Sequence, residues 1–297
     1  MAGYLYLALG SSPSSKIIKV RLSDFTREAS LTLSSGSENA YCFAIDSVNG
    51  FLYVGCNTNP GRIYKIRLSD FTEVATLVSS LGGKNYYRNS LVIDTTNGFL
   101  YAQTGDGGAA PTIKIRLSDF TEVDSVVIPA FFGAQFHQGI IDVNRGFAYF
   151  GSSINSYIGR INLSDFTGSS YTAFANTSQS SSIDTINNKG YWGLNALPGR
   201  IIKVGLCSIS TDSPILESTL ILPSGDSTVV SQAIDASSGF LYCGTYDVPA
   251  KILKIRLSDF TKVSELVMPS GEDRSIYDAS IDTVNGFAYF AISTNPI

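Results

Sequence analysis

One octapeptide, Arg-Leu-Ser-Asp-Phe-Thr-Glu-Val, constrains the fold more than any other feature of this chain. It occurs unchanged at Arg67–Val74 and Arg116–Val123, and near-copies begin at Arg21, Asn162 and Arg256. Its aromatic position recurs every 43 to 51 residues, at Phe25, Phe71, Phe120, Phe166 and Phe260, with Ile209 in a degenerate copy. Self-similarity at such a period indicates a repeat architecture, in which each copy packs against the same surroundings as the one before it.

Each repeat is predicted to contain four short strands. In 112–117, Ile and Leu residues alternate with Lys114 and Arg116, which is the period of a pleated strand with one apolar face. The segment Phe-Leu-Tyr-Val at 51–54 is apolar on both faces and is expected to be covered on both sides. An Ile-Asp pair precedes an Asn-Gly or similar turn in every repeat, and we expect these aspartates to cap the turns rather than to form a ring of carboxylates. The turns follow Asp46, Asp94, Asp142, Asp184, Asp235 and Asp282.

Four antiparallel strands per repeat, with no helical periodicity, predict an all-β chain folded as a β-propeller. Each strand type occurs about six times, so six blades of four antiparallel strands are predicted, with seven blades as the alternative. The 297 residues are expected to form a single propeller domain, spanning 1–297. The approximate repeat units are 1–39, 40–85, 86–135, 136–179, 180–228 and 229–274, with 275–297 as a closing segment.

The consensus Ile-Asp-turn-Gly-Phe-Leu-Tyr-Val-Gly, followed by Ile-x-Lys-Ile-Arg-Leu, resembles the bacterial-type short-repeat propellers of the broad YVTN and NHL group. The resemblance covers nearly the whole chain and implies the propeller fold, but it implies no particular chemistry. The chain lacks the Gly-His and Trp-Asp pairs of WD40 repeats. It also lacks the Asp-box of the sialidases.

The two ends of the chain do not divide into whole repeats. The chain starts at a second-type strand, Gly3–Gly10, and stops after another, Gly286–Ser293. We expect Tyr277–Ile281 and the first three N-terminal strands to complete a blade, so that strands from both termini close the ring. The second-strand position then has two candidates. Our hypothesis is that one of them, Phe287–Ile292, is free to pair with another copy of the protein; the alternative is a peripheral extra strand.

The loops of a propeller differ between its two faces. The turns between strands one and two, and between three and four, are nearly invariant here, whereas the remaining loops vary in length and chemistry, which is where repeat proteins place recognition. Tyr and Arg provide large contact areas with a polar end. The predicted ligand-binding residues in the variable loops are Tyr41, Tyr86, Tyr87, Arg88, Phe136, His137, Gln138, Asp273, Arg274 and Tyr277. The alternative is that these aromatic residues plug a narrow central channel.

Composition argues against several classes of function. The net charge is −4 and there is no run of Lys or Arg, which argues against a nucleic-acid-binding surface. No apolar stretch approaches the roughly 20 residues of a membrane-spanning helix. His137 is the only histidine, so a multi-histidine metal site is excluded, and we predict no metal and no cofactor. Cys42, Cys56, Cys207 and Cys243 form no CxxC pair and are predicted to be free thiols.

The predicted function is that of a non-catalytic binding or scaffold protein, which recognises a protein or a glycan through the variable loops. The reason is that no nucleophile–base pair, metal constellation or phosphate-binding loop can be identified. A multivalent lectin is one form of this prediction. The alternatives are a structural subunit of a virion, appendage or surface assembly, and a propeller enzyme of the lactonase or lyase type. No signal peptide is recognised, so the cytoplasm is the default location, with a virion or the extracellular surface as the alternative.

Overall fold

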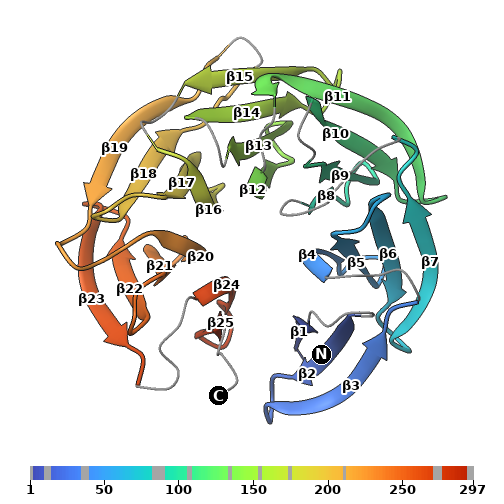
Figure 1. The fold of residues 1–297 in the computed structure, drawn as a ribbon, viewed down its shortest axis with the longest axis horizontal. Helices are drawn as coiled ribbons and strands as arrows, with labels where there is room; N and C mark the ends of the chain where they lie inside the picture. Colours follow the sequence, from blue (N-terminus) through green and yellow to red (C-terminus); the bar gives the residue numbers. More distant parts are fainter. Residues whose placement is uncertain are drawn as a thin grey trace. The chain divides into compact units, whose positions relative to one another are not determined.

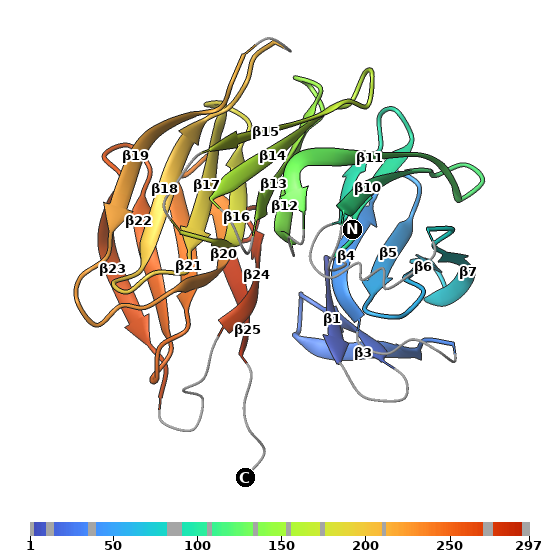
Figure 2. The same cartoon turned by 45° about the horizontal axis from the view of Figure 1, so that its top comes forward.

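The computed structural model of the chain consists of β-strands joined by turns and loops (Figures 1 and 2). The residues described are 3–9, 15–34, 40–81, 91–105, 109–132, 136–152, 156–172, 176–209, 212–269 and 276–292. Within these ranges there is no helix long and apolar enough to cross a membrane. The chain divides into two compact units, Met1–Phe136 and His137–Ile297, which are described one at a time.

The first unit contains three antiparallel sheets, each built from consecutive strands. The first sheet comprises β1 (Tyr4–Leu9), β2 (Lys16–Arg21) and β3 (Thr26–Thr32). The second comprises β4 (Ala40–Asp46), β5 (Phe51–Cys56), β6 (Arg62–Arg67) and β7 (Thr72–Val78). The third comprises β8 (Leu91–Asp94), β9 (Phe99–Gln103), β10 (Ala109–Arg116) and β11 (Thr121–Phe132).

The second unit contains three four-stranded sheets and one two-stranded sheet, again from consecutive antiparallel strands. The first comprises β12 (Phe136–Asp142), β13 (Phe147–Ser152), β14 (Tyr157–Asn162) and β15 (Gly168–Thr172). The second comprises β16 (Ser178–Asp184), β17 (Lys189–Leu194), β18 (Arg200–Gly205) and β19 (Ile215–Ile221). The third comprises β20 (Val229–Asp235), β21 (Phe240–Thr245), β22 (Lys251–Arg256) and β23 (Thr261–Val267), and the last comprises β24 (Ile276–Asp282) and β25 (Phe287–Ile292).

These sheets are the blades of a six-bladed β-propeller. Five of the sheets have all four strands, whereas β1–β3 has three strands and β24–β25 has two. Both second-type strands from the ends of the chain are hydrogen-bonded within their own sheets, β1 to β2 and β25 to β24. Closure of the ring by both termini, and pairing of Phe287–Ile292 with another copy, stay predictions.

The turns between first and second strands are capped by aspartate, as predicted. In the turn after β4, the Asp46 carboxylate accepts hydrogen bonds from the backbone N–H of Asn49 at 2.9 Å and from its Nδ2 at 2.8 Å. The turns after Asp94, Asp184 and Asp282 have the same pair of bonds. Because each of these carboxylates is engaged by its own turn, the prediction of turn capping is confirmed at these positions.

The turns between third and fourth strands place a phenylalanine in the left-handed region of the Ramachandran map. Phe71, Phe120 and Phe260 have φ of 54°, 55° and 53°, a conformation that costs an L-residue roughly 1–2 kcal/mol. At Phe120 and Phe260 the ring favours phenylalanine despite this cost, because it is buried against a tyrosine of the preceding blade. The ring centroids of Phe120 and Tyr53 lie 5.6 Å apart, and those of Phe260 and Tyr191 lie 5.8 Å apart.

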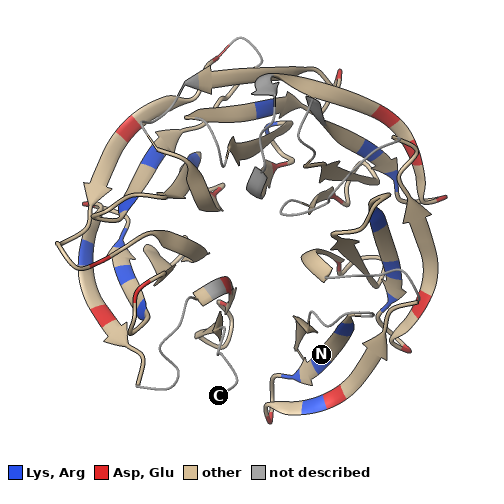
Figure 3. Cartoon of the chain, in the orientation of Figure 1, with Lys and Arg blue, Asp and Glu red and all other residues tan. Residues whose placement is uncertain are grey.

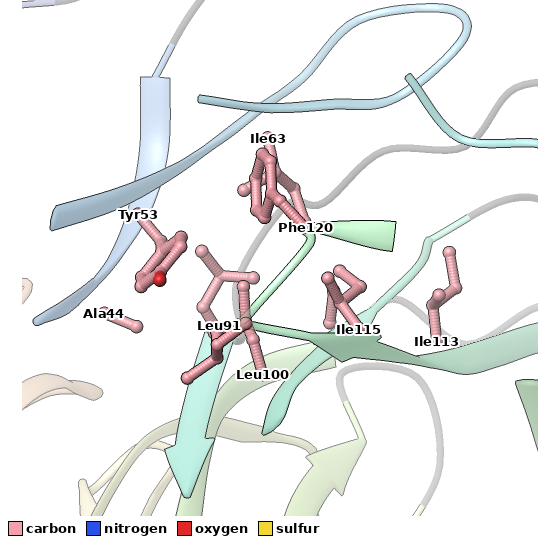
Figure 4. Close-up of a cluster of buried hydrophobic side chains, with 10 residues drawn as sticks. Ala44, Tyr53, Ile63, Leu91, Leu100, Ile113, Ile115 and Phe120 are labelled. Atoms are coloured by element: carbon pink, nitrogen blue, oxygen red, sulfur yellow. The ribbon is translucent and has the colours of Figure 1, made fainter. Parts of the chain in front are cut away.

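Apolar side chains fill the space between adjacent blades. One such cluster joins the sheets β4–β7 and β8–β11, where Tyr53 and Ile63 meet Leu100 and Ile113 from the next blade (Figure 4). The predicted burial of both faces of the second strand is confirmed, since Leu52, Tyr53 and Val54 are all fully buried. A blade therefore buries its two faces against its neighbours, which is why the repeats resemble one another.

The third strands carry most of the cations of the blades and the fourth strands many of the anions (Figure 3). Lys65 on β6 lies with its Nζ 4.2 Å from the Phe51 ring centroid, and Lys254 on β22 lies 3.9 Å from that of Phe240. Lys65 also donates a hydrogen bond to the Leu117 carbonyl of the next blade. Burial lowers the pKa of Lys65. These lysines therefore contribute to packing as well as to charge.

Glycine on the second strands allows the next blade to approach closely. A Cβ atom added at Gly193 would lie 2.6 Å from the Val229 carbonyl oxygen of the next blade, so the backbone would have to shift. We expect Gly193→Ala to lower the free energy of unfolding by about 2 kcal/mol. Gly239→Ala is the control, since its added Cβ meets nothing within 4 Å and only its φ of 76° opposes the change, at about 1 kcal/mol. Urea denaturation of both variants measures the difference; equal losses would show that the contact between blades does not matter.

Candidate functional site

Some of the predicted ligand-binding residues lie within the described ranges and others do not. Tyr41 lies in β4 and is exposed. Phe136, His137 and Gln138 lie in β12 and Tyr277 lies in β24, but only the backbone is described there. The remaining predicted residues lie outside the described ranges: Tyr86, Tyr87, Arg88, Asp273 and Arg274. The convergence of these ten residues on one ligand therefore stays a prediction.

The first strands β4, β16, β20 and β24 share an irregularity that the sequence did not predict. The register of β4 on β5 shifts between Ala40 and Cys42, which leaves Tyr41 as a bulge. Equivalent shifts leave Gln179, Val230 and Tyr277 as bulges on β16, β20 and β24. A bulge redirects a side chain out of the ordinary pleat, and such features are common near binding sites. Two of the predicted residues, Tyr41 and Tyr277, occupy this position.

The variable-loop region that is fully described lies in the second unit, on blades β16–β19 and β20–β23. We call it the tip surface and define it as residues 195–199, 223–228 and 246–250. The first and third of these segments join second to third strands, and the middle one joins β19 to β20. In an antiparallel blade these connections lie at the same end of the sheet.

Hydrogen bonds tie the middle segment of the tip surface to both of its neighbours. The backbone N–H of Gly199 donates to the Asp226 carbonyl at 2.8 Å, and Thr228 donates through Oγ1 to Asn195 at 3.0 Å. On the other side, the N–H of Ser227 donates to Asp247 at 2.9 Å. These bonds link loops from two blades into one surface. A pre-organised surface of this kind loses little conformational entropy on binding.

Ion pairs of Asp226 connect the tip surface to the strands β22 and β23. The Asp226 side chain is only 3% exposed and accepts hydrogen bonds from Lys251 at 2.5 Å and Lys262 at 2.6 Å. Burial alone would raise the pKa of this carboxyl, but the bonds from Lys251 and Lys262 outweigh burial and hold the pKa below its usual value. The hydrogen bond to Asp226 likewise raises the pKa of Lys251. All three groups are therefore charged near neutral pH.

The most exposed large side chains of the tip surface are apolar or aromatic, and its half-buried carboxylate, Asp247, is engaged by the N–H of Ser227. Leu197 is 81% exposed and Val248 is 74% exposed, and Tyr246 and Pro249 are exposed beside them. The charged groups of Asp226 and Lys251 are directed to each other. The cores of protein–protein interfaces share this composition, being depleted in charge and enriched in aromatic and aliphatic groups.

Leu197, Tyr246 and Val248 are not among the predicted ligand-binding residues, which lie near the beginnings of the first strands. The sequence nevertheless contains a pattern that these three residues share. Each residue lies in a segment that follows a second strand and contains proline, as in Asn195–Gly199. Lys262, which pairs with Asp226, also departs from the repeat pattern, since two other repeats have glutamate at this position, Glu73 and Glu122.

The cysteines of the chain lie outside the tip surface. All four cysteines are free thiols, and burial raises the pKa of Cys56 to about 12, so this thiol is protonated and a poor nucleophile at neutral pH. Burial also raises the pKa of Cys243. Among the residues that the structure describes, no three His, Cys, Asp or Glu side chains are grouped so that they could hold a metal ion.

Sequence comparison finds no relative, whereas structural comparison finds other propellers. No protein-family model matches the chain, and no curated protein matches it. The structure of hydrazine synthase from Kuenenia stuttgartiensis is similar, with a TM-score of 0.78 and 10% identity over 98% of this chain and 92% of that chain. The structure of the RRP9 WD40 repeats has a TM-score of 0.74 and 11% identity, over 97% of this chain and 83% of that chain. The Cps50 (Swd1) β-propeller domain of Myceliophteria thermophila has a TM-score of 0.71 and 11% identity, over 93% of this chain and 85% of that chain.

These similarities concern the fold alone, because the identities are so low. The prediction of an all-β, six-bladed propeller is confirmed by them and by the strand order. The propeller part of the family resemblance is confirmed as well, while its assignment to the YVTN and NHL group stays a prediction. Glycan recognition, a structural role in a virion, and the lack of enzymatic activity also stay predictions.

Proposed function

We propose that this protein is a non-catalytic scaffold that binds another protein through the tip surface. The observation that carries the proposal is the exposure of Leu197 and Val248 on adjacent blades, within loops that hydrogen bonds hold together. An aliphatic pair on a pre-organised frame provides the buried centre that a protein interface needs. A surface without free cations does not suit the phosphates of a nucleic acid.

Further support comes from the fold comparisons and from the chemistry of the chain. The RRP9 WD40 repeats and the Cps50 (Swd1) β-propeller domain have a similar fold. Protonated, buried thiols and the lack of a metal-binding group among the described side chains are consistent with binding rather than catalysis. We also infer that the repeats are of the short YVTN and NHL type, since the Gly-His and Trp-Asp pairs of WD40 repeats are missing from the sequence.

The proposal can be tested in two stages. First, a photo-crosslinking amino acid at position 197 should capture a protein partner from cells that express the full chain, whereas the same group at Ile186, an exposed residue on a turn between first and second strands, should not. Second, the double substitution Leu197→Asp with Val248→Asp should weaken binding of the purified partner at least about tenfold, because two apolar contacts are replaced by buried charges. Titration calorimetry measures this change.

The matched control is Ile186→Asp, which places the same charge on an exposed aliphatic residue of the same unit. Its affinity should equal that of the wild type. If the double variant binds as tightly as the wild type while Ile186→Asp does not, the interface lies on the opposite loops and the proposal is wrong. A ligand that proves to be a glycan would also contradict it.

A further inference from the structure

Three turns of the chain contain asparagine followed by glycine: Asn49–Gly50, Asn97–Gly98 and Asn285–Gly286. Asparagine is chemically labile, because the backbone nitrogen of the next residue can attack its side-chain carbonyl carbon. Glycine favours this attack, since it has no side chain and few restrictions on its backbone. The three turns are therefore candidates for spontaneous covalent change.

Hydrogen bonds restrain all three turns in the folded state. In the third, the Asp282 carboxylate accepts from the backbone N–H of Asn285 at 3.0 Å and from its Nδ2 at 2.7 Å. The N–H of Gly286, whose nitrogen would be the nucleophile, donates to the Asp282 carbonyl at 2.9 Å. The turns after Asp46 and Asp94 are restrained in the same way. Attack therefore requires the turn to open.

The third turn differs from the others in its surroundings. Asp46 and Asp94 are fully buried, and the strands that follow them, β5 and β9, are each paired on both edges within their sheets. Residues 283–288 are all exposed, and β25 is paired in its sheet with β24 alone. A segment with fewer buried contacts opens at a lower cost in free energy. Opening should therefore be most frequent at Asn285.

We propose that Asn285 is the principal site of spontaneous deamidation in this protein. After the turn opens, the deprotonated backbone nitrogen of Gly286 forms a bond to Cγ of Asn285. The bond from Cγ to Nδ2 breaks, and the nitrogen takes up a proton and leaves as ammonia. One water molecule then hydrolyses the cyclic imide at either carbonyl, giving aspartate or isoaspartate. The net reaction converts an amide and water into a carboxylate and ammonium, with no oxidation or reduction.

The product would not restore the turn. In the unmodified chain, the Nδ2–H of Asn285 donates to the Asp282 carboxylate. This bond is the largest of the effects that lower the pKa of Asp282. After the reaction, two carboxylates face each other where a hydrogen bond had been, and both are charged at neutral pH. The modification is therefore expected to loosen the β24–β25 hairpin.

The chain supplies its own control. Asn187 makes the same two bonds to Asp184, at 2.9 and 2.8 Å, but the next residue is Asn188, which takes the position of the glycine with a φ of 56°. Its side chain hinders the attack. The substitution Gly286→Asn copies this arrangement, so it should block the reaction and keep the turn. Asn285→Ser copies Ser238 of the turn after Asp235, and it removes the reactive amide.

The experiment is a time course of peptide mapping by mass spectrometry on the folded, full-length chain at mildly alkaline pH. Deamidation at Asn285 should be at least about tenfold faster than at Asn49 or Asn97, because opening is easier there. Gly286→Asn should abolish it, and hydrogen exchange of 276–292 should rise in step with the modified fraction in the wild type but not in Asn285→Ser. Equal rates at the three sites, or an unchanged rate at Asn285 in Gly286→Asn, would overturn the proposal.

Discussion

Replacing Asp226 with asparagine is expected to lower the free energy of unfolding by about 3 kcal/mol, because it leaves the partly buried ammonium group of Lys251 without its ion-pair partner and leaves Lys262 paired with Glu265 alone. The carboxylate is 3% exposed, and Lys251 and Lys262 are 18% and 19% exposed. The two lysines would then face each other across a neutral amide. Urea denaturation of the full chain, with the wild type in parallel, measures the loss.

The same carboxylate predicts a dependence on pH. The pKa of Asp226 is lower in the folded chain than the value of about 3.9 expected when the chain is unfolded. The stabilisation is therefore complete above about pH 4 and is lost as the pH falls from there through the folded pKa. The acid-induced decline should be smaller in Asp226→Asn than in the wild type.

Asp70→Asn is the control, since the Asp70 carboxylate also pairs with a cation but is largely exposed. Exposed ion pairs contribute about 0–1 kcal/mol. A loss for Asp226→Asn no greater than that for Asp70→Asn would contradict the assignment of Asp226 as the anchor of the tip surface.

Removing the ring of Phe120 is the second change with a large expected effect. Phe120→Ala should cost about 3 kcal/mol, because a buried ring that packs on Tyr53 of the preceding blade is lost. Phe120→Gly removes one more carbon atom, yet it should cost less than Phe120→Ala. The reason is that φ is 55° at this position, and glycine adopts this conformation without the penalty that an L-residue incurs.

Denaturation of the two Phe120 variants separates the two effects. The loss common to both measures the contact of the ring, and the difference between them measures the backbone strain. If alanine and glycine destabilise the chain equally, the strain at this turn is negligible. Val123→Ala, on the same hairpin and partly exposed, provides the baseline for a change outside the contact between blades.

The strands and turns could be predicted from the sequence because their causes are local. The alternation around Lys114 and the Asp-Asn-Gly turns each depend on a few neighbouring residues, and the repeats supplied several copies of the same signal. The bulge at Tyr41 could not be predicted, because it is a mismatch with the partner strand β5. A strand pattern alone does not record the register in which it pairs.

The tip surface was harder to predict for a related reason. Asp226 lies in a segment that reads as an ordinary polar loop, and its partners Lys251 and Lys262 come from two later strands. Only the fold brings these three residues together. The exposure of Leu197 also runs against the usual expectation that a leucine is buried.

The stacking of Phe120 on Tyr53, and of Phe260 on Tyr191, gives the repeat a direction. The unit that contains Phe71 and Tyr53 has both contacts, because Phe71 stacks on Tyr6 of its predecessor and Tyr53 receives Phe120 of its successor. A tandem duplication of one whole unit would therefore create a junction that already fits. An ancestral gene could lengthen by copying such a segment without new compensating mutations. The identical sequences of residues 67–74 and 116–123 are what recent copying of this kind would produce.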